Sequence, residues 1–130
     1  MTSRSLRIMI IDDEPCIRDS LQWYLEDLGY QVVVGPEPFN CDVYQGRDCC
    51  RKVSCTDVLL IDQHLPGMKG LDFVEALATR GCQGIRSNIL LMSGDSTSID
   101  LNKARELGIT VVQKPMELDF LAKWLNEILS

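Results

Sequence analysis

Residues 57–70, Asp-Val-Leu-Leu-Ile-Asp-Gln-His-Leu-Pro-Gly-Met-Lys-Gly, decide the fold of this chain. The apolar run from Val58 to Ile61 ends directly at Asp62 and is followed by a Pro-Gly turn signal. A short, continuous apolar run with these boundaries is typical of a β-strand that is buried on both faces. In open α/β sheets, ligands bind just outside the carboxyl ends of such strands. The stretch therefore predicts a central parallel strand that carries the carboxylate of Asp62 at its functional end.

The flanking sequence repeats a pattern of strand followed by helix. Four more apolar or β-branched runs predict strands, at residues 6–11, 31–34, 88–92 and 110–113. Apolar residues at helical spacing, with Gly or Pro near the boundaries, predict helices over residues 15–28, 69–79, 97–107 and 117–129. In the last helix four residues are expected to face inward: Leu118, Leu121, Leu125 and Ile128. Alternating strands and helices require crossover connections, and therefore an α/β fold with a parallel sheet. We expect five βα units in a single domain over residues 1–130, with no output domain.

One segment, between Gly35 and Thr56, does not fit this alternation. A helix is due there, but two prolines and a glycine interrupt the sequence. The segment also contains four of the six cysteines: Cys41, Cys49, Cys50 and Cys55. We expect an irregular segment that replaces much of the second helix. Three interpretations of these cysteines stay open, namely buried free thiols, a redox or disulfide role, and a metal site, although the segment has no C-x-x-C pair. Cys16 and Cys82, outside this segment, are expected in the core.

Composition excludes several classes of function. The net charge is −6 and the isoelectric point about 4.7, which argues against binding to nucleic acid or to an anionic membrane surface, since both need a basic face. No apolar run approaches the ~20 residues that a membrane-spanning helix needs. Hydrophobic residues make up 45% of the chain, an ordinary globular balance. We therefore expect a cytoplasmic protein with reduced cysteines.

Polar residues stand at the carboxyl ends of four predicted strands: Asp12 and Asp13, Asp62, Ser93, and Lys114. Parallel strands end at one edge of the sheet, so these side chains should converge. Clustered carboxylates repel one another, and a hard cation such as Mg²⁺ relieves that repulsion. With Mg²⁺ and Lys114 balancing the charge of a phosphoryl group and Ser93 donating a hydrogen bond, Asp62 would accept that group as an aspartyl phosphate.

Taken together, the motifs resemble those of response-regulator receiver domains of two-component signalling. The matching stretches are Ile-Ile-Asp12-Asp13-Glu, Leu-Leu-Ile-Asp62 with Leu65-Pro66-Gly67-Met68 and Gly70, Leu-Met-Ser93-Gly, and Lys114-Pro115. The resemblance extends along nearly the whole chain. It implies a doubly wound, five-stranded parallel sheet of the flavodoxin-like (βα)5 type, with strand order 2-1-3-4-5.

The resemblance also implies a role for each residue. Asp62 would be the phosphoacceptor, and Ser93 and Lys114 would be the switch and catalytic side chains. Asp13 would bind Mg²⁺ directly and Asp12 mostly through water, and Asp62 and the backbone carbonyl of His64 would supply further ligands. The peptide bond before Pro115 would be cis. The phosphoryl donor would be a sensor histidine kinase or a phosphotransfer protein, and the domain would act as a monomer or weak dimer through contacts with other proteins or through phosphorelay.

Two further residues, Val111 and His64, bear on how the expected site would work. Val111 stands where the family often has an aromatic residue, three positions before the lysine, so an aromatic switch is not expected on the last strand. The side chain of His64 could flank the phosphoryl group or be a solvated loop histidine. Two other functions stay open for the whole chain: a metal- or redox-sensing scaffold that depends on the cysteines, and a Mg²⁺-dependent phosphohydrolase that uses an aspartyl phosphate.

Overall fold

The central strand β3, Val58–Asp62, is buried along its whole length, as its unbroken apolar run predicted. The computed structural model describes residues 6–35, 56–65, 67–79, 88–95 and 99–129. Its other strands are β1 (Arg7–Ile11), β2 (Gln31–Gly35), β4 (His64–Leu65), β5 (Met68–Lys69), β6 (Ile89–Ser93) and β7 (Ile109–Gln113). Its helices are α1 (Pro15–Asp27), α2 (Gly70–Thr79), α3 (Leu101–Glu106) and α4 (Leu118–Leu129).

Five of the strands form one parallel sheet in the order β2-β1-β3-β6-β7. This confirms the expected order 2-1-3-4-5, because β6 and β7 are the fourth and fifth strands of the sheet along the chain. Ile10, Leu60 and Leu90 lie in register across its centre. The structure adds a short antiparallel pair, β4 with β5, where the sequence predicted only a loop. The carboxyl ends of β1, β3, β6 and β7 are thereby brought to one edge.

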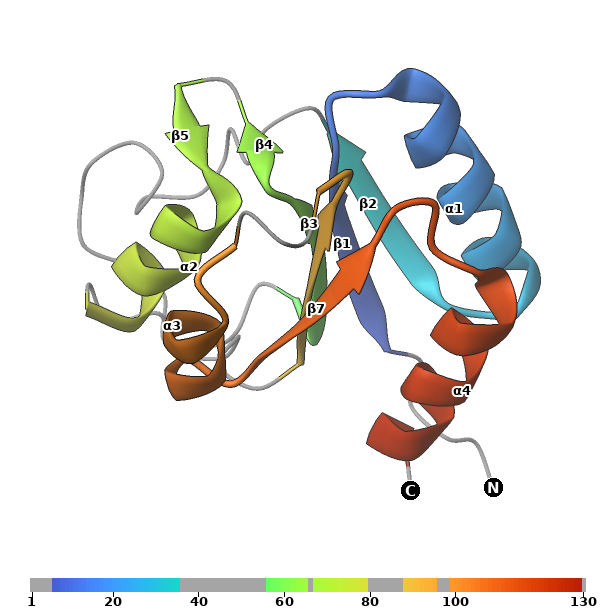
Figure 1. The fold of residues 1–130 in the computed structure, drawn as a ribbon. Coiled ribbons are helices and arrows are strands. Elements are labelled where there is room, and N and C mark those ends of the chain that lie inside the picture. The colour runs from blue at the N-terminus through green and yellow to red at the C-terminus, as the bar shows by residue number, and fades with distance from the viewer. Residues whose placement is uncertain (1–5, 36–55, 66, 80–87, 96–98, 130) are drawn as a thin grey trace.

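Helices cover both faces of the sheet, with α1 and α4 on one face and α2 and α3 on the other (Figure 1). Each face has its own hydrophobic core. Successive residues of a strand point to opposite faces, so Leu60 packs with α1 and α4, whereas Leu59 and Ile61 pack with α2 and α3. Asp62 therefore continues the face of Leu60, while Ser93 continues the face of Leu91, on the side of α2 and α3.

Two expectations about burial were wrong. Leu121 and Leu125 are fully buried, as predicted, but Leu118 is 40% exposed. Leu118 is the first residue of α4, and helical side chains lean toward the amino end, so this side chain extends past the helix. Cys16 is exposed rather than in the core. It lies nine residues before the buried Leu25, which at 3.6 residues per turn places it on the opposite side of α1.

Some expectations fall on residues that the structure does not describe. The cysteine-rich segment occupies residues 36–55, and Cys82 is also outside the described ranges. The irregular structure expected for the cysteine-rich segment therefore stays a prediction. The helix expected from residue 97 is described from Leu101 onward. Among the described helices, none combines the length and the apolar character required to span a bilayer.

Candidate functional site

Asp12 is fixed at the end of β1 by contacts with both of its neighbours in space. Its amide donates to the Gly35 carbonyl at 3.1 Å, which joins it to β2. Its carboxylate Oδ1 accepts a hydrogen bond from the Glu14 amide at 2.9 Å, and this turn leads directly into α1. Arg18, one turn into α1, donates from Nη1 to the Asp12 carbonyl at 2.8 Å. The start of α1 and the end of β1 thus hold this carboxylate in a single place.

Asp62 is positioned by the residue that follows it. The Gln63 amide donates to the Met92 carbonyl of β6 at 2.8 Å. The buried Gln63 side chain accepts a hydrogen bond from the Leu71 amide at 2.9 Å, which ties the loop to the start of α2. The His64 amide donates to Asp62 Oδ1 at 3.3 Å. The backbone after β3 therefore folds back over the Asp62 carboxylate.

Gly70 makes this close packing possible. A Cβ atom at this position would lie 2.5 Å from the Asp62 carbonyl oxygen and 2.9 Å from Leu91 Cδ1. Contacts below 3.0 Å to a backbone atom are not tolerated without displacement. Glycine is therefore required for α2 to begin directly against the end of β3.

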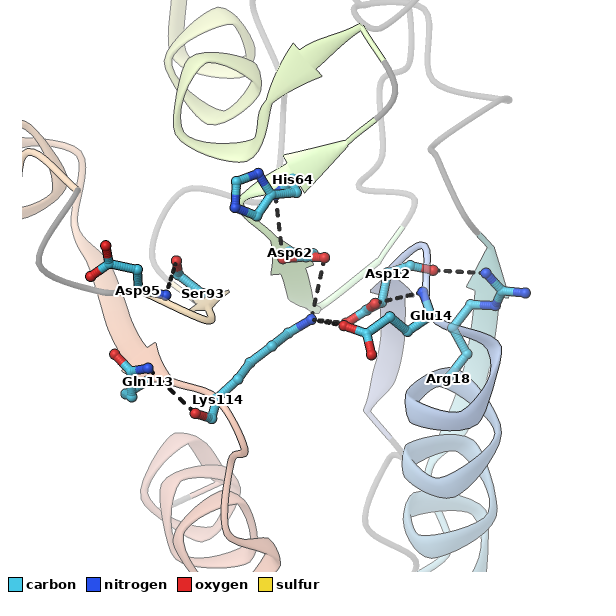
Figure 2. A network of polar contacts seen from close by, with 9 residues as sticks. All are labelled: Asp12, Glu14, Arg18, Asp62, His64, Ser93, Asp95, Gln113 and Lys114. Atoms are coloured by element: carbon cyan, nitrogen blue, oxygen red, sulfur yellow. Dashed lines mark hydrogen bonds and ion pairs between the residues drawn. The ribbon is translucent and has the colours of Figure 1, made fainter.

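Lys114 reaches from the end of β7 to the carboxylates (Figure 2). Its Nζ lies 2.9 Å from Asp12 Oδ2, 3.2 Å from Glu14 Oε1 and 3.3 Å from Asp62 Oδ2. Its amide donates to the Ser93 carbonyl at 2.8 Å, which fixes β7 against β6. The peptide bond between Lys114 and Pro115 is cis. One ammonium group thus contacts three carboxylates, two from the turn between β1 and α1 and one from the end of β3.

The site shifts the pKa values of both Asp62 and Lys114. Burial raises the pKa of Asp62; the nearby charge of Asp12 adds to the rise, while the His64 amide and Lys114 oppose it. Burial alone would lower the pKa of Lys114, but its contacts with Asp12, and then Asp62 and Glu14, outweigh that effect and raise it. Lys114 therefore keeps its proton, and the surroundings of Asp62 oppose ionisation of its carboxyl group.

Four carboxylates gather here: Asp12, Asp13, Glu14 and Asp62 each offer an oxygen, and these atoms lie within 4.8 Å of one another. Asp12 Oδ2 is buried and makes no well-aligned hydrogen bond with any described residue; its close cation is the ammonium of Lys114, as an ion pair. An all-oxygen set with a buried, incompletely satisfied carboxylate suits a hard divalent ion. The residues present therefore fit a magnesium site.

Ser93 and His64 flank this group. Ser93 is buried, and its hydroxyl accepts a hydrogen bond from the Asp95 amide at 3.1 Å. The Gln113 side chain donates to the Gly94 carbonyl, which links the loop after β6 to β7.

His64 is exposed. Val111 is partly buried and packs on the core beneath α2 and α3.

Sequence reasoning assigned no role to three residues that shape the site, although Glu14 and Gly70 lie within the quoted motifs. Glu14 contacts Lys114, Arg18 contacts the Asp12 carbonyl, and Gly70 abuts the backbone of Asp62. The sequence signal for Glu14 was its place directly after two aspartates. For Arg18 the signal was its position about one turn into the predicted helix over residues 15–28, and for Gly70 it was a glycine near the start of the predicted helix over residues 69–79.

The chain matches known proteins along most of its length. The family model described as "Response regulator receiver domain" matches residues 8–126. The transcriptional regulatory protein AruR of Pseudomonas aeruginosa is 30% identical over 102 residues, which is 78% of this chain. The TorCAD operon transcriptional regulatory protein TorR of Escherichia coli K12 is 32% identical over 123 residues, or 94% of this chain.

A solved structure gives the same result. The receiver domain of the TMAO respiratory system response regulator TorR is 31% identical, with a TM-score of 0.71, and the match covers 95% of this chain and 96% of that domain. The complete relatives are longer: this chain spans 40% of AruR and 49% of TorR. The similarity therefore concerns one domain of these regulators.

Proposed function

Because the chain belongs to the response regulator receiver domain family, whose members are phosphoacceptors in two-component signalling, we propose that Asp62 is its phosphoacceptor. One observation supports this most directly. The Lys114 ammonium lies 3.3 Å from Asp62 Oδ2 and 2.9 Å from Asp12 Oδ2, at the edge where four carboxylates converge. A nucleophilic carboxylate, a cation and a set of oxygen ligands thus occur together.

The proposed reaction is a transfer of a phosphoryl group to the Asp62 carboxylate. An Asp62 oxygen attacks phosphorus, a new O–P bond forms, and the bond from phosphorus to the donor breaks, with its electron pair leaving on the donor. For a phosphohistidine donor, the leaving imidazole takes up a proton. Lys114 would then donate a hydrogen bond to one phosphoryl oxygen, and the Ser93 hydroxyl would turn from the Asp95 amide to another.

Mg²⁺ would be held by Asp12, Asp13 and Asp62, with the His64 carbonyl as a further ligand. When bound, it would neutralise charge on the phosphoryl oxygens. The chain's own contribution is geometric. The hydrogen bond from the Glu14 amide fixes one oxygen of Asp12, which leaves Oδ2 as the oxygen directed toward Lys114 and Asp62.

The partners belong to the same proposal. The donor would be a sensor histidine kinase or a phosphotransfer protein, and the setting would be the cytoplasm. The output would be an altered contact with another protein or onward phosphorelay. The chemistry of the chain would be limited to phosphorylation of its own Asp62 and hydrolysis of that phosphate. With Val111 in place of an aromatic residue, transmission would start from Ser93, whose loop Gln113 connects to β7.

The decisive experiment is intact-protein mass spectrometry after incubation with acetyl phosphate and Mg²⁺. We expect one phosphoryl group on the wild-type chain, none on Asp62→Asn, and none on wild type when EDTA replaces Mg²⁺. Asp72→Asn is the matched control, because Asp72 is an exposed carboxylate on α2 that lies outside the site. A wild-type chain without an adduct, or an adduct that persists in Asp62→Asn, would contradict the proposal.

A further inference from the structure

Three carboxylate oxygens surround the Lys114 ammonium, those of Asp12, Glu14 and Asp62. Glu14 Oε1 accepts a hydrogen bond from this ammonium at 3.2 Å, whereas Asp12 Oδ2 is paired with it by charge alone. Since the proposed function requires Lys114 to contact a phosphoryl oxygen, that oxygen must compete with these carboxylates for the ammonium during loading.

Burial distinguishes the three partners. The side chains of Asp12 and Asp62 are 0% and 3% exposed, whereas that of Glu14 is 58% exposed. A buried carboxylate that loses its cation has no water to replace it, and the penalty is large. The Glu14 carboxylate can return to solvent. Glu14 is therefore the partner that Lys114 can release most easily.

The local structure of Glu14 supports a specific role in this contact. Glu14 is the N-cap residue of α1, a position where a short polar side chain such as aspartate accepts hydrogen bonds from the first amides of the helix. Here its side chain makes no capping hydrogen bond. It contacts Lys114, one hundred positions later in the chain, at 3.2 Å. The side chain thus forgoes a local partner in favour of a distant one.

We propose that Glu14 is a positioning residue that holds one N–H of the resting Lys114 ammonium toward solvent and releases it when Asp62 is loaded. This inference rests on the proposed function. Its consequence is kinetic: the Glu14 contact slows loading, because it must break before Lys114 can serve the phosphoryl group. Removing the contact while leaving Asp12, Asp62 and Lys114 in place should therefore speed loading.

The test compares two substitutions at Glu14. Glu14→Gln removes the charge. Glu14→Asp keeps the charge but shortens the side chain by one methylene, and an aspartate at an N-cap turns toward the helix amides. Asp19→Asn is the charge control, since Asp19 is an exposed carboxylate further along α1. Initial rates of loading from acetyl phosphate are measured by mass spectrometry at two concentrations of Mg²⁺ that both saturate the site. Thermal unfolding checks that each variant is folded.

Exposed ion pairs contribute little, so we expect Glu14→Gln and Glu14→Asp each to load about twofold to fivefold faster than wild type, with Asp19→Asn unchanged. If Glu14 acted only by repelling the anionic donor, Glu14→Asp would match wild type, and that result would overturn the inference. Equal or slower rates in both Glu14 variants would also overturn it. Absence of any adduct on wild type is a different outcome, because it removes the proposed function and this inference with it.

Discussion

Charged side chains are arranged differently at the two ends of the sheet. At the amino end, Asp57 accepts hydrogen bonds from the Arg7 amide at 2.9 Å, from Nε at 3.2 Å and from Nη2 at 3.2 Å. Thr56 donates to the Arg7 carbonyl, and Asn88 donates to the Asp57 carbonyl. Here the Arg7 guanidinium and the Asp57 carboxylate form a two-pronged pair, the strong geometry for these groups. At the carboxyl end four carboxylates gather, and three of them, those of Asp12, Glu14 and Asp62, contact the ammonium of Lys114.

The amino end of the sheet contributes stability, whereas the carboxyl end holds the residues of the proposed chemistry. The pairing at the amino end joins β1 to β3 and needs nothing from solution. The carboxyl end keeps an excess of negative charge that only an added cation can balance. Sites that perform chemistry commonly carry such locally unfavourable arrangements. Four substitutions test this difference between the two ends. The stability of each variant can be followed by urea unfolding with and without Mg²⁺.

The largest effect is expected for Lys114→Ala without metal. Buried Asp12 and Asp62 lose their cation, so the free energy of unfolding should fall by about 2 kcal/mol, below the full value for a buried pair because the site opens to solvent. Mg²⁺ should stabilise this variant more than wild type, since no ammonium competes for Asp12 Oδ2. A loss of stability that Mg²⁺ does not change would show that the carboxylates bind no metal.

Gly70→Ala should have a similar effect by a steric route. The added Cβ would meet the Asp62 carbonyl at 2.5 Å, and overpacking of this kind costs about 1–3 kcal/mol. Because the displaced backbone carries Asp62, loading from acetyl phosphate should slow as well. Gly94→Ala is a suitable control, since a Cβ at Gly94 meets no atom within 4 Å. Unchanged stability in Gly70→Ala would mean that α2 can move away from β3 freely.

Asp57→Asn tests the amino end. It weakens the pair with Arg7 while keeping the shape of the side chain, and hydrogen bonds to charged groups contribute about 1.5–3 kcal/mol. Allowing for the partial exposure of Arg7, we expect a loss of about 1 kcal/mol. Mg²⁺ should not restore it, and phosphoryl loading should be unaffected. Recovery of stability by Mg²⁺ would contradict the separation of the two ends.

The smallest effect is a gain in stability in Asp62→Asn. The folded state raises the pKa of Asp62 above its ordinary value of 3.8, so the folded protein holds this proton more tightly than the unfolded chain does. The stability that Asp62 contributes therefore falls as pH rises from below 3.8 through the raised folded pKa. In EDTA at neutral pH, Asn should raise the melting temperature by about 2–4 °C. The gain should shrink in acid; a gain that is equal at both pH values would rule out this cause.

Much of the fold and part of the site followed from the sequence. The parallel sheet was predictable because five apolar runs alternate with helical patterns, whereas the strand order came from the family resemblance. A shared edge then brings Asp12, Asp62 and Lys114 together. Which of the carboxylates Lys114 contacts was not predictable, since Glu14 enters through its side-chain conformation at the helix start. The exposure of Cys16 and Leu118 depends on where each helix meets the sheet, which a periodic pattern leaves undefined at its ends.

The pleat of the strands has one more consequence. Val58 and Leu60 belong to the core under α1 and α4, while Leu59 and Ile61 belong to the core under α2 and α3. The sheet is thus a partition between two separately packed interiors. Side chains in the two interiors can vary without the compensation that neighbours in one interior require. The surface formed by α1 and α4 and that formed by α2 and α3 can therefore change independently of each other while the carboxyl edge of the sheet stays the same.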